Sequence, residues 1–253
     1  MRKLILISIG IIIIISSVLL LHAMAKYSDV QIYSCGHAGF LIKSSDGTRI
    51  LMDPFDTSIG YEAPYIISDI VTISNSRPEH SSLTWAHGRP QIIKELGPHK
   101  YKSIIIQGFQ SFVNDSETAL KKKQNIMYII ETDGLRILHC GALGETLTDR
   151  QYKKLGDIDI LIIPVGGLYM LSPKEAIDVV NKINPKIIIP MAYKTKECNL
   201  KLEDVSEFLR GFDKVEFVNY LEIGAKEVKK LKGVYLLGSI LNEPYYRRKK
   251  SED

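Results

Sequence analysis

The sequence predicts an α/β protein, with one domain of two packed β-sheets and helices on the outside. Its first half carries short apolar strands joined by hairpin turns, among them Ser45-Asp46-Gly47 and Asp133-Gly134. Its second half alternates amphipathic helices with apolar runs that are typical of buried strands. No internal repeat or low-complexity linker interrupts the chain after residue 26. A single domain over residues 26–243 therefore accounts for both halves.

Short strands dominate the first half. Apolar and β-branched stretches predict them at residues 30–33, 39–43, 49–52, 70–73, 103–107, 125–131 and 136–139. Gln91–Leu96 instead predicts a short helix, which Gly97-Pro98 would close. Asp53-Pro54 ends the third strand, because proline cannot donate a hydrogen bond to a β-ladder.

Two capping boxes mark helix starts in the second half. Thr148 with Gln151 begins one helix, and Ser172 with Glu175 begins the next. The remaining predicted elements are a helix at residues 204–210 and strands at residues 158–165, 186–191, 215–218 and 234–237. The predicted order is therefore β-α-β in this half.

Residues 1–25 predict either a signal peptide or an N-terminal transmembrane anchor. Arg2 and Lys3 precede the apolar segment Leu4–Leu21, and the small-x-small site Ala23-Met24-Ala25 follows it. At about 1.5 Å per residue the segment nearly spans a ~30 Å hydrocarbon core. Both alternatives stay open. In both, the domain is exported, either periplasmic or extracellular, or anchored with the domain outside the cytoplasm.

The composition of the chain excludes few classes of protein function. A net charge of +4, with only short basic runs such as Lys121–Lys123 and the basic, polar tail at 244–253, does not indicate nucleic-acid binding. Cys35, Cys140 and Cys198 leave the disulfide state open, because their number is odd and they are widely spaced. No CxxC pair is present, so a structural zinc finger is not indicated.

The chemistry-bearing stretch lies at the end of the strand at residues 70–73. A polar turn there carries Asn75, Arg77, Glu79 and His80. Side chains delivered at the end of a buried strand are where α/β folds place their chemistry. This turn is therefore the first candidate for a site.

Five segments in order resemble the metallo-β-lactamase superfamily, in the branch of ascorbate-phosphate lactonase-like hydrolases. They are GHAGFLIKSSDGTRILMDPFD from Gly36, VTIS before the polar turn, NIMYIIETDGLRILHCGALG from Asn125, IDILIIPVGG from Ile158 and PKIIIPMAYK from Pro185. The resemblance implies an αββα sandwich of two mixed sheets flanked by helices. It also implies one or two metal ions, usually zinc, whose bound hydroxide hydrolyses an ester, lactone, amide or phosphodiester.

The polar turn falls on the family's HxHxDH metal-binding loop. By that resemblance, Asn75 and Arg77 stand where the first two histidines belong. Glu79 stands at the aspartate, and His80 is the last histidine, retained. Arginine brings a permanent positive charge to a place where a divalent cation would sit.

Three further ligand positions of the family carry aliphatic residues. Val113 replaces the downstream histidine, Ala142 the bridging aspartate of the GDLG motif, and Ala192 the last histidine. None of these side chains offers a lone pair. No metal or other cofactor is therefore expected; if one binds, Glu79 and His80 are the remaining ligands.

Two neighbouring residues complete the relict pocket. His37 lies in a Gly-His-Ala turn that the family shares, and a hydrogen-bonded structural role is favoured over a catalytic one. Asp53 is expected to accept hydrogen bonds from loop amides and to shape the pocket rim. His80 is interpreted equally as structural or as part of the relict pocket.

The sequence thus favours a pseudoenzyme that binds or scaffolds an unknown small molecule or protein, with a membrane as partner only through an uncleaved N-terminal segment. The alternative is a metal-dependent hydrolase of the same fold, in which Glu79, His80, Asp115 and Glu145 rebuild a site for zinc or another divalent ion. A further hypothesis is that Arg77 replaces the cation and pairs with Glu79 or Asp115.

Overall fold

The protein is described by a computed structural model that covers residues 29–114, 123–243 and 246. The predicted N-terminal segment, most of the tail and Asp115 lie outside these residues. Within them, no helix has both the length and the apolar character needed to cross a bilayer. Cys35, Cys140 and Cys198 are buried free thiols.

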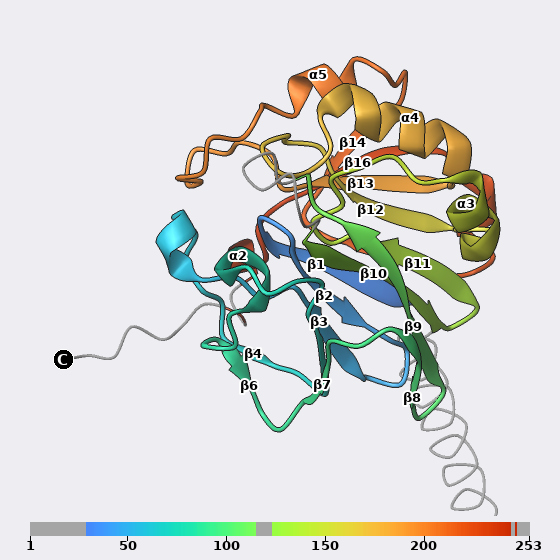
Figure 1. The fold of residues 1–253 in the computed structure, drawn as a ribbon. Helices are drawn as coiled ribbons and strands as arrows, with labels where there is room; N and C mark the ends of the chain where they lie inside the picture. Colours follow the sequence, from blue (N-terminus) through green and yellow to red (C-terminus); the bar gives the residue numbers. More distant parts are fainter. Residues whose placement is uncertain (1–28, 115–122, 244–245, 247–253) are drawn as a thin grey trace, which may run out of the picture.

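Two β-sheets pack face to face and form the centre of the molecule (Figure 1). The first is six-stranded. Its strands, in spatial order, are β15 (Leu221–Ile223), β1 (Val30–Gly36), β2 (Gly39–Lys43), β3 (Arg49–Met52), β5 (Ile70–Thr72) and β7 (Gln91–Ile93). The first four of these pair antiparallel, and β3, β5 and β7 pair parallel.

The second sheet is eight-stranded and also mixed. Its strands, in spatial order, are β14 (Val215–Val218), β16 (Gly233–Leu237), β13 (Ile187–Met191), β12 (Ile160–Pro164), β11 (Leu135–His139), β10 (Gln124–Thr132), β9 (Ile104–Phe112) and β8 (Gly97–Tyr101). Strands β8 to β11 pair antiparallel, and the others pair parallel. A small third sheet pairs β4 (Ile66–Ile67) with β6 (Ala86–His87).

Helices flank mainly the eight-stranded sheet, as Figure 1 shows. They are α3 (Asp149–Leu155), α4 (Pro173–Ile183) and α5 (Ser206–Leu209); α2 (Pro78–Ser81) follows β5, and 3₁₀ turns lie at Thr57–Ile59, Val228–Lys230 and Ile240–Asn242. Both predicted capping boxes are present, at the starts of α3 and α4. The fold is the predicted αββα sandwich with few helices.

The main core lies between the sheets. Side chains such as Ile42 and Met52 of the first sheet belong to one cluster with Ile106 and Ile129 of the second. A smaller cluster on the other face of the first sheet is centred on Trp85, whose indole N–H donates to the carbonyl of Phe55 at 2.7 Å. These two clusters hold the first sheet from both sides.

The predicted helix at Gln91–Leu96 is wrong. Gln91–Ile93 forms β7, which pairs parallel with β5 and buries Ile93, and Gly97–Tyr101 forms β8 instead of a helix end. A six-residue segment is too short to show helical periodicity, and the two isoleucines favour a strand. The predicted helix at 204–210 is shorter, at Ser206–Leu209, and β15 was not predicted.

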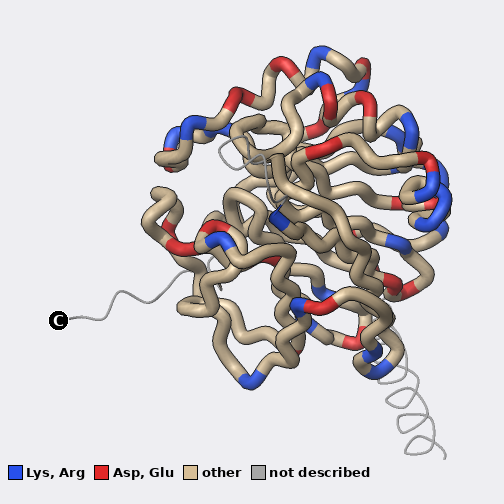
Figure 2. The backbone as a smooth tube through the Cα atoms, in the orientation of Figure 1, with Lys and Arg blue, Asp and Glu red and all other residues tan. Residues whose placement is uncertain are grey.

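Charged residues of both signs lie interspersed along the outer loops and helices of the described chain (Figure 2). This distribution agrees with the modest net charge of +4. A face that binds nucleic acid usually carries clustered lysine and arginine residues, which differs from this mixed distribution.

Candidate functional site

The candidate site lies where the first sheet meets the loops that follow β11, β12 and β13. Asn75, Arg77, Glu79 and His80 come from the turn after β5 and from α2. Pro78 opens that helix at its first turn, where a missing N–H costs nothing.

The three aliphatic positions are buried, as expected for side chains without polar atoms. Val113 lies one residue beyond β9, Ala142 follows β11 and Ala192 follows β13. The backbone N–H of Ala142 donates to Asn125 Oδ1 at 2.8 Å, and that of Ala192 donates to the carbonyl of His37 at 3.0 Å. Backbone hydrogen bonds therefore fix these loop ends.

A buried carboxylate holds the turn in place. Asp53 and His80 are both 0% exposed, and His80 Nδ1 lies 2.9 Å from Asp53 Oδ2. The backbone N–H of Ser74 donates to Asp53 Oδ1 at 2.8 Å, and its hydroxyl donates to Oδ2. A buried carboxylate is tolerated only when it is paired and hydrogen-bonded, so these three bonds tie the ends of β3 and β5 to α2.

His37 sits beside this pair but is not hydrogen-bonded. Its ring centroid lies 5.2 Å from that of His80, and its φ is 49°. Neither ring nitrogen of His37, nor Nε2 of His80, has a hydrogen-bond partner among the described residues. The sequence predicted a hydrogen-bonded histidine in this turn. The turn is present, but the His37 imidazole makes no hydrogen bond to the described residues, so that part of the prediction is wrong.

Burial determines the charge of His37. It holds the pKa of the imidazole well below its ordinary value, and the nearby His80 lowers it further. His37 is thus a neutral ring with an unused donor and an unused acceptor.

Arg77, Glu79 and Tyr169 form a second cluster, here called the guanidinium cluster. The guanidinium carbon of Arg77 lies 4.0 Å from the centroid of the Tyr169 ring. Tyr169 Oη donates to Glu79 Oε1 at 2.8 Å, and Arg77 Nη1 lies 3.6 Å from the same oxygen. The hypothesised pairing of Arg77 with Glu79 is therefore present, and pairing with Asp115 lies outside the described residues.

The sequence did not assign Tyr169 to this cluster. It lies in the loop between β12 and α4, about ninety residues from Glu79 along the chain. Burial raises the pKa of its hydroxyl, and the Glu79 carboxylate raises it further, so the group stays a neutral donor. An aromatic residue in a loop was the only signal in the sequence.

The donor groups do not fit the family's metal. Among residues 29–114, 123–243 and 246, no group of three or more His, Cys, Asp or Glu side chains could hold an ion. Zinc in proteins takes three or four protein ligands. The rebuilt set of Glu79, His80 and Glu145 is therefore not assembled by these residues, and Asp115 lies outside them.

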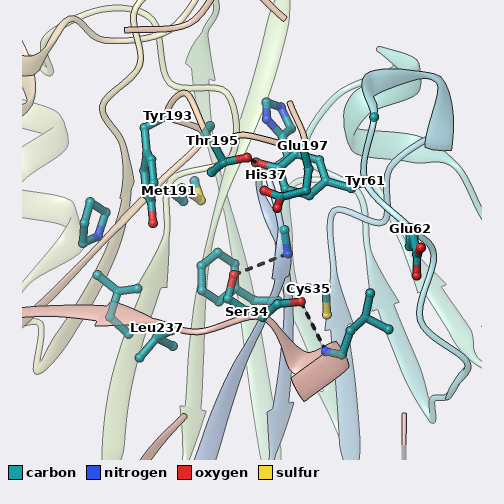
Figure 3. A pocket seen from close by; sticks show the side chains of 18 of the residues that line it. Ser34, Cys35, His37, Tyr61, Glu62, Met191, Tyr193, Thr195, Glu197 and Leu237 are labelled. Atoms are coloured by element: carbon teal, nitrogen blue, oxygen red, sulfur yellow. Dashed lines mark hydrogen bonds between the residues drawn. The ribbon is translucent and has the colours of Figure 1, made fainter. Parts of the chain in front are cut away.

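Two cavities border the site. One, of about 470 Å³, is lined by Asn75, Arg77 and Val113. The other, of about 610 Å³, is lined by His37 and Ala192 together with residues of β1, β13 and β16 (Figure 3). Of the seven family positions, Asn75, Arg77 and Val113 line the smaller cavity and Ala192 lines the larger, while Glu79, His80 and Ala142 line neither.

Removing the guanidinium should destabilise the domain. Arg77→Ala loses a cation–π contact worth about 0.5–2 kcal/mol and an ion pair worth about 0.2–1 kcal/mol. We expect a free energy of unfolding lower by about 1–2 kcal/mol in urea denaturation. Arg89→Ala, at an exposed arginine, is the control and should change little. An unchanged unfolding midpoint in Arg77→Ala would contradict this role.

Removing the charge of Asp53 should cost more. Asp53→Asn keeps the shape but weakens the bonds to Ser74 and His80, and leaving a buried hydrogen-bonding group unsatisfied costs about 1–3 kcal/mol each. Asp178→Asn, on the exposed face of α4, should stay within about 0.5 kcal/mol of the parent. Denaturation of both variants beside the parent measures the difference, and equal losses would contradict the structural role.

Stability should fall with falling pH. Burial lowers the pKa of both His37 and His139, whereas unfolded histidine takes up a proton near pH ~6.5. Below that pH the unfolded state binds more protons, so the free energy of unfolding decreases. His37→Asn, which tolerates the positive φ, should flatten the dependence between about pH 7.5 and 5.5. His99→Asn should leave it unchanged, and a parental slope in His37→Asn would refute the assignment.

The chain is similar to known proteins over most of its described part. Residues 31–192 match the family described as Beta-lactamase superfamily domain. A UPF0173 metal-dependent hydrolase of Thermococcus onnurineus is 26% identical over 196 residues, covering 66% of this chain and 85% of that protein. A UPF0173 protein of Pyrococcus furiosus is 27% identical over 188 residues, covering 66% and 84%.

Solved structures of the same superfamily are also similar to this chain. A metallo-β-lactamase superfamily structure from Thermotoga maritima is 33% identical with a TM-score of 0.69, and the match covers 82% of this chain and 98% of that one. A metallo hydrolase from Ignicoccus hospitalis, 19% identical with a TM-score of 0.59 and coverage of 83% and 95%, shares the fold. The predicted family is thereby confirmed: the chain belongs to the metallo-β-lactamase superfamily.

Proposed function

We propose that this protein is a non-catalytic member of its superfamily that binds a small molecule and holds no divalent ion at the family's metal positions. One observation carries the proposal: Arg77 stacks on Tyr169 and pairs with Glu79 in the loop that should bind the ion. A guanidinium is always charged, so it opposes a cation at that place.

The cavity of about 610 Å³ supports the binding half of the proposal. Small-molecule sites in proteins usually measure about 300–1,000 Å³ and combine apolar walls with a few polar groups. Here Phe40, Met191 and Leu237 supply apolar surface, and Ser34 and Thr195 supply hydroxyls.

We also propose that the domain works outside the cytoplasm. The N-terminal sequence, with its basic residues, apolar segment and small-x-small site, supports this location.

A second candidate is a metal-dependent hydrolase of lactone, ester or phosphodiester bonds. The names of the relatives favour this candidate over the pseudoenzyme, because several are called metal-dependent hydrolases. For this chain it requires an ion on Glu79 and on the unpartnered Nε2 of His80. The described side chains supply no third ligand near them.

Metal analysis of the purified full-length chain separates the two candidates. We expect less than about 0.1 zinc, iron or manganese per chain after exposure to each metal, because too few donors are present. The matched positive control restores the family's ligands by Asn75→His, Arg77→His, Glu79→Asp, Val113→His, Ala142→Asp and Ala192→His. This variant should bind about one or two ions.

A stoichiometric ion in the parent chain would overturn the pseudoenzyme. A hydrolysis panel of lactone, phosphodiester and thioester substrates, with and without added metal, gives the second measurement. We expect parent rates equal to those of His80→Ala. Turnover that depends on both metal and His80 would establish the hydrolase instead.

A further inference from the structure

The larger cavity is built by segments far apart in the chain. Its walls come from the end of β1, the loop after the 3₁₀ turn at Thr57–Ile59, the end of β13 with the residues that follow it, and the end of β16 with the 3₁₀ turn at Ile240–Asn242. Figure 3 shows Tyr193 on one side, and Tyr61, Thr195 and Glu197 gathered on another. Leu237, Ser34 and Cys35 lie across from them.

The charge of this cavity is opposite to that of the chain. Its charged lining residues are Glu62 and Glu197, and no lysine or arginine of the described chain lines it, although the net charge is +4. Neither carboxylate makes a hydrogen bond or an ion pair with another described residue. A bound anion would therefore meet negative charge, with no compensating lysine or arginine from the part of the chain that the structure describes.

Two tyrosines give the cavity aromatic surface beside the carboxylate. Tyr61 is fixed in place: Thr195 Oγ1 donates to its hydroxyl at 2.9 Å. Its ring also lies against Gly36, where an added Cβ would come within 2.7 Å of Tyr61 Cδ1. Tyr193 stands across the cavity (Figure 3), and burial raises the pKa of both hydroxyls, so both rings stay neutral. Neutral aromatic rings next to a carboxylate are the surroundings that attract ammonium groups.

A buried polar group also points to a ligand. His37 is 4% exposed, and both of its ring nitrogens lack a partner among the described residues. Buried polar atoms of this kind are normally satisfied by protein, water or ligand. His37 lines the same cavity, at its end nearest His80.

We propose that this cavity binds a small organic cation, a primary amine or quaternary ammonium with an apolar body, whose charge lies between Tyr61 and Glu197. The apolar body packs on Phe40, Met191 and Leu237. The inference rests on the proposed binding function and names its ligand class.

Three probes with one phenyl body and different charge test the class: phenethylamine, phenethyl alcohol and 3-phenylpropanoate. Calorimetric titration of the full-length chain should give the tightest binding for the amine and at least fivefold weaker binding for the alcohol. The carboxylate should bind weakest, since it meets Glu62 and Glu197.

Variants locate the charge. Glu197→Gln should weaken amine binding about five- to tenfold and leave the alcohol unchanged, because only the amine pairs with the carboxylate. Tyr61→Leu should weaken the amine more than the alcohol. Glu207→Gln, at an exposed acid of α5, is the matched control and should change neither.

Binding of the alcohol or the carboxylate as tightly as the amine would overturn the cation inference and leave a binding function in place. Loss of amine affinity in Glu207→Gln, or none in Glu197→Gln, would overturn it as well. Failure of the proposed function has a separate signature, metal-dependent turnover that His80→Ala abolishes.

Discussion

The site depends on the buried carboxylate of Asp53. It accepts hydrogen bonds from the backbone and the hydroxyl of Ser74 and lies 2.9 Å from His80 Nδ1. Those contacts join the ends of two strands to a helix of only four residues. So short a helix has little stability of its own. The carboxylate therefore holds the loop against the ends of the two strands.

The guanidinium cluster shows which groups partner the acid in the loop. Several carboxylates and imidazoles close together repel or must be neutralised when no cation is bound. Here Glu79 meets a guanidinium and a phenol hydroxyl. Arg77 is in turn stabilised by the face of Tyr169. One stacked arginine thus supplies the positive charge that the remaining acid needs.

Local features of the sequence predicted much of the fold. The capping boxes at Thr148 and Ser172 and the Asp133-Gly134 hairpin depend on residues within a few positions of each other, and all are present. Gln91–Ile93 was misread because its strand character comes from parallel pairing with β5, which local propensity does not encode.

The site could be predicted only in part. The family loop was found from its spacing, but Tyr169 reaches it from a distant loop, and the larger cavity forms among four separate segments. The unpartnered imidazole of His37 was also missed, because hydrogen bonding in a turn depends on what packs above it.

On our proposal, the ion-free loop and the acidity of the larger cavity are physically connected. His37 lines that cavity, and its ring lies 5.2 Å from the ring of His80. A divalent ion on His80 would therefore lie on the side of the cavity that His37 lines, and its field would reach about one Debye length, ~10 Å. At such a separation in a partly buried site, two like charges repel by roughly a kcal/mol or more. If the loop holds the stacked, acid-paired Arg77 and no divalent ion, as we propose, this repulsion is weaker and an organic cation becomes an acceptable ligand for the neighbouring cavity.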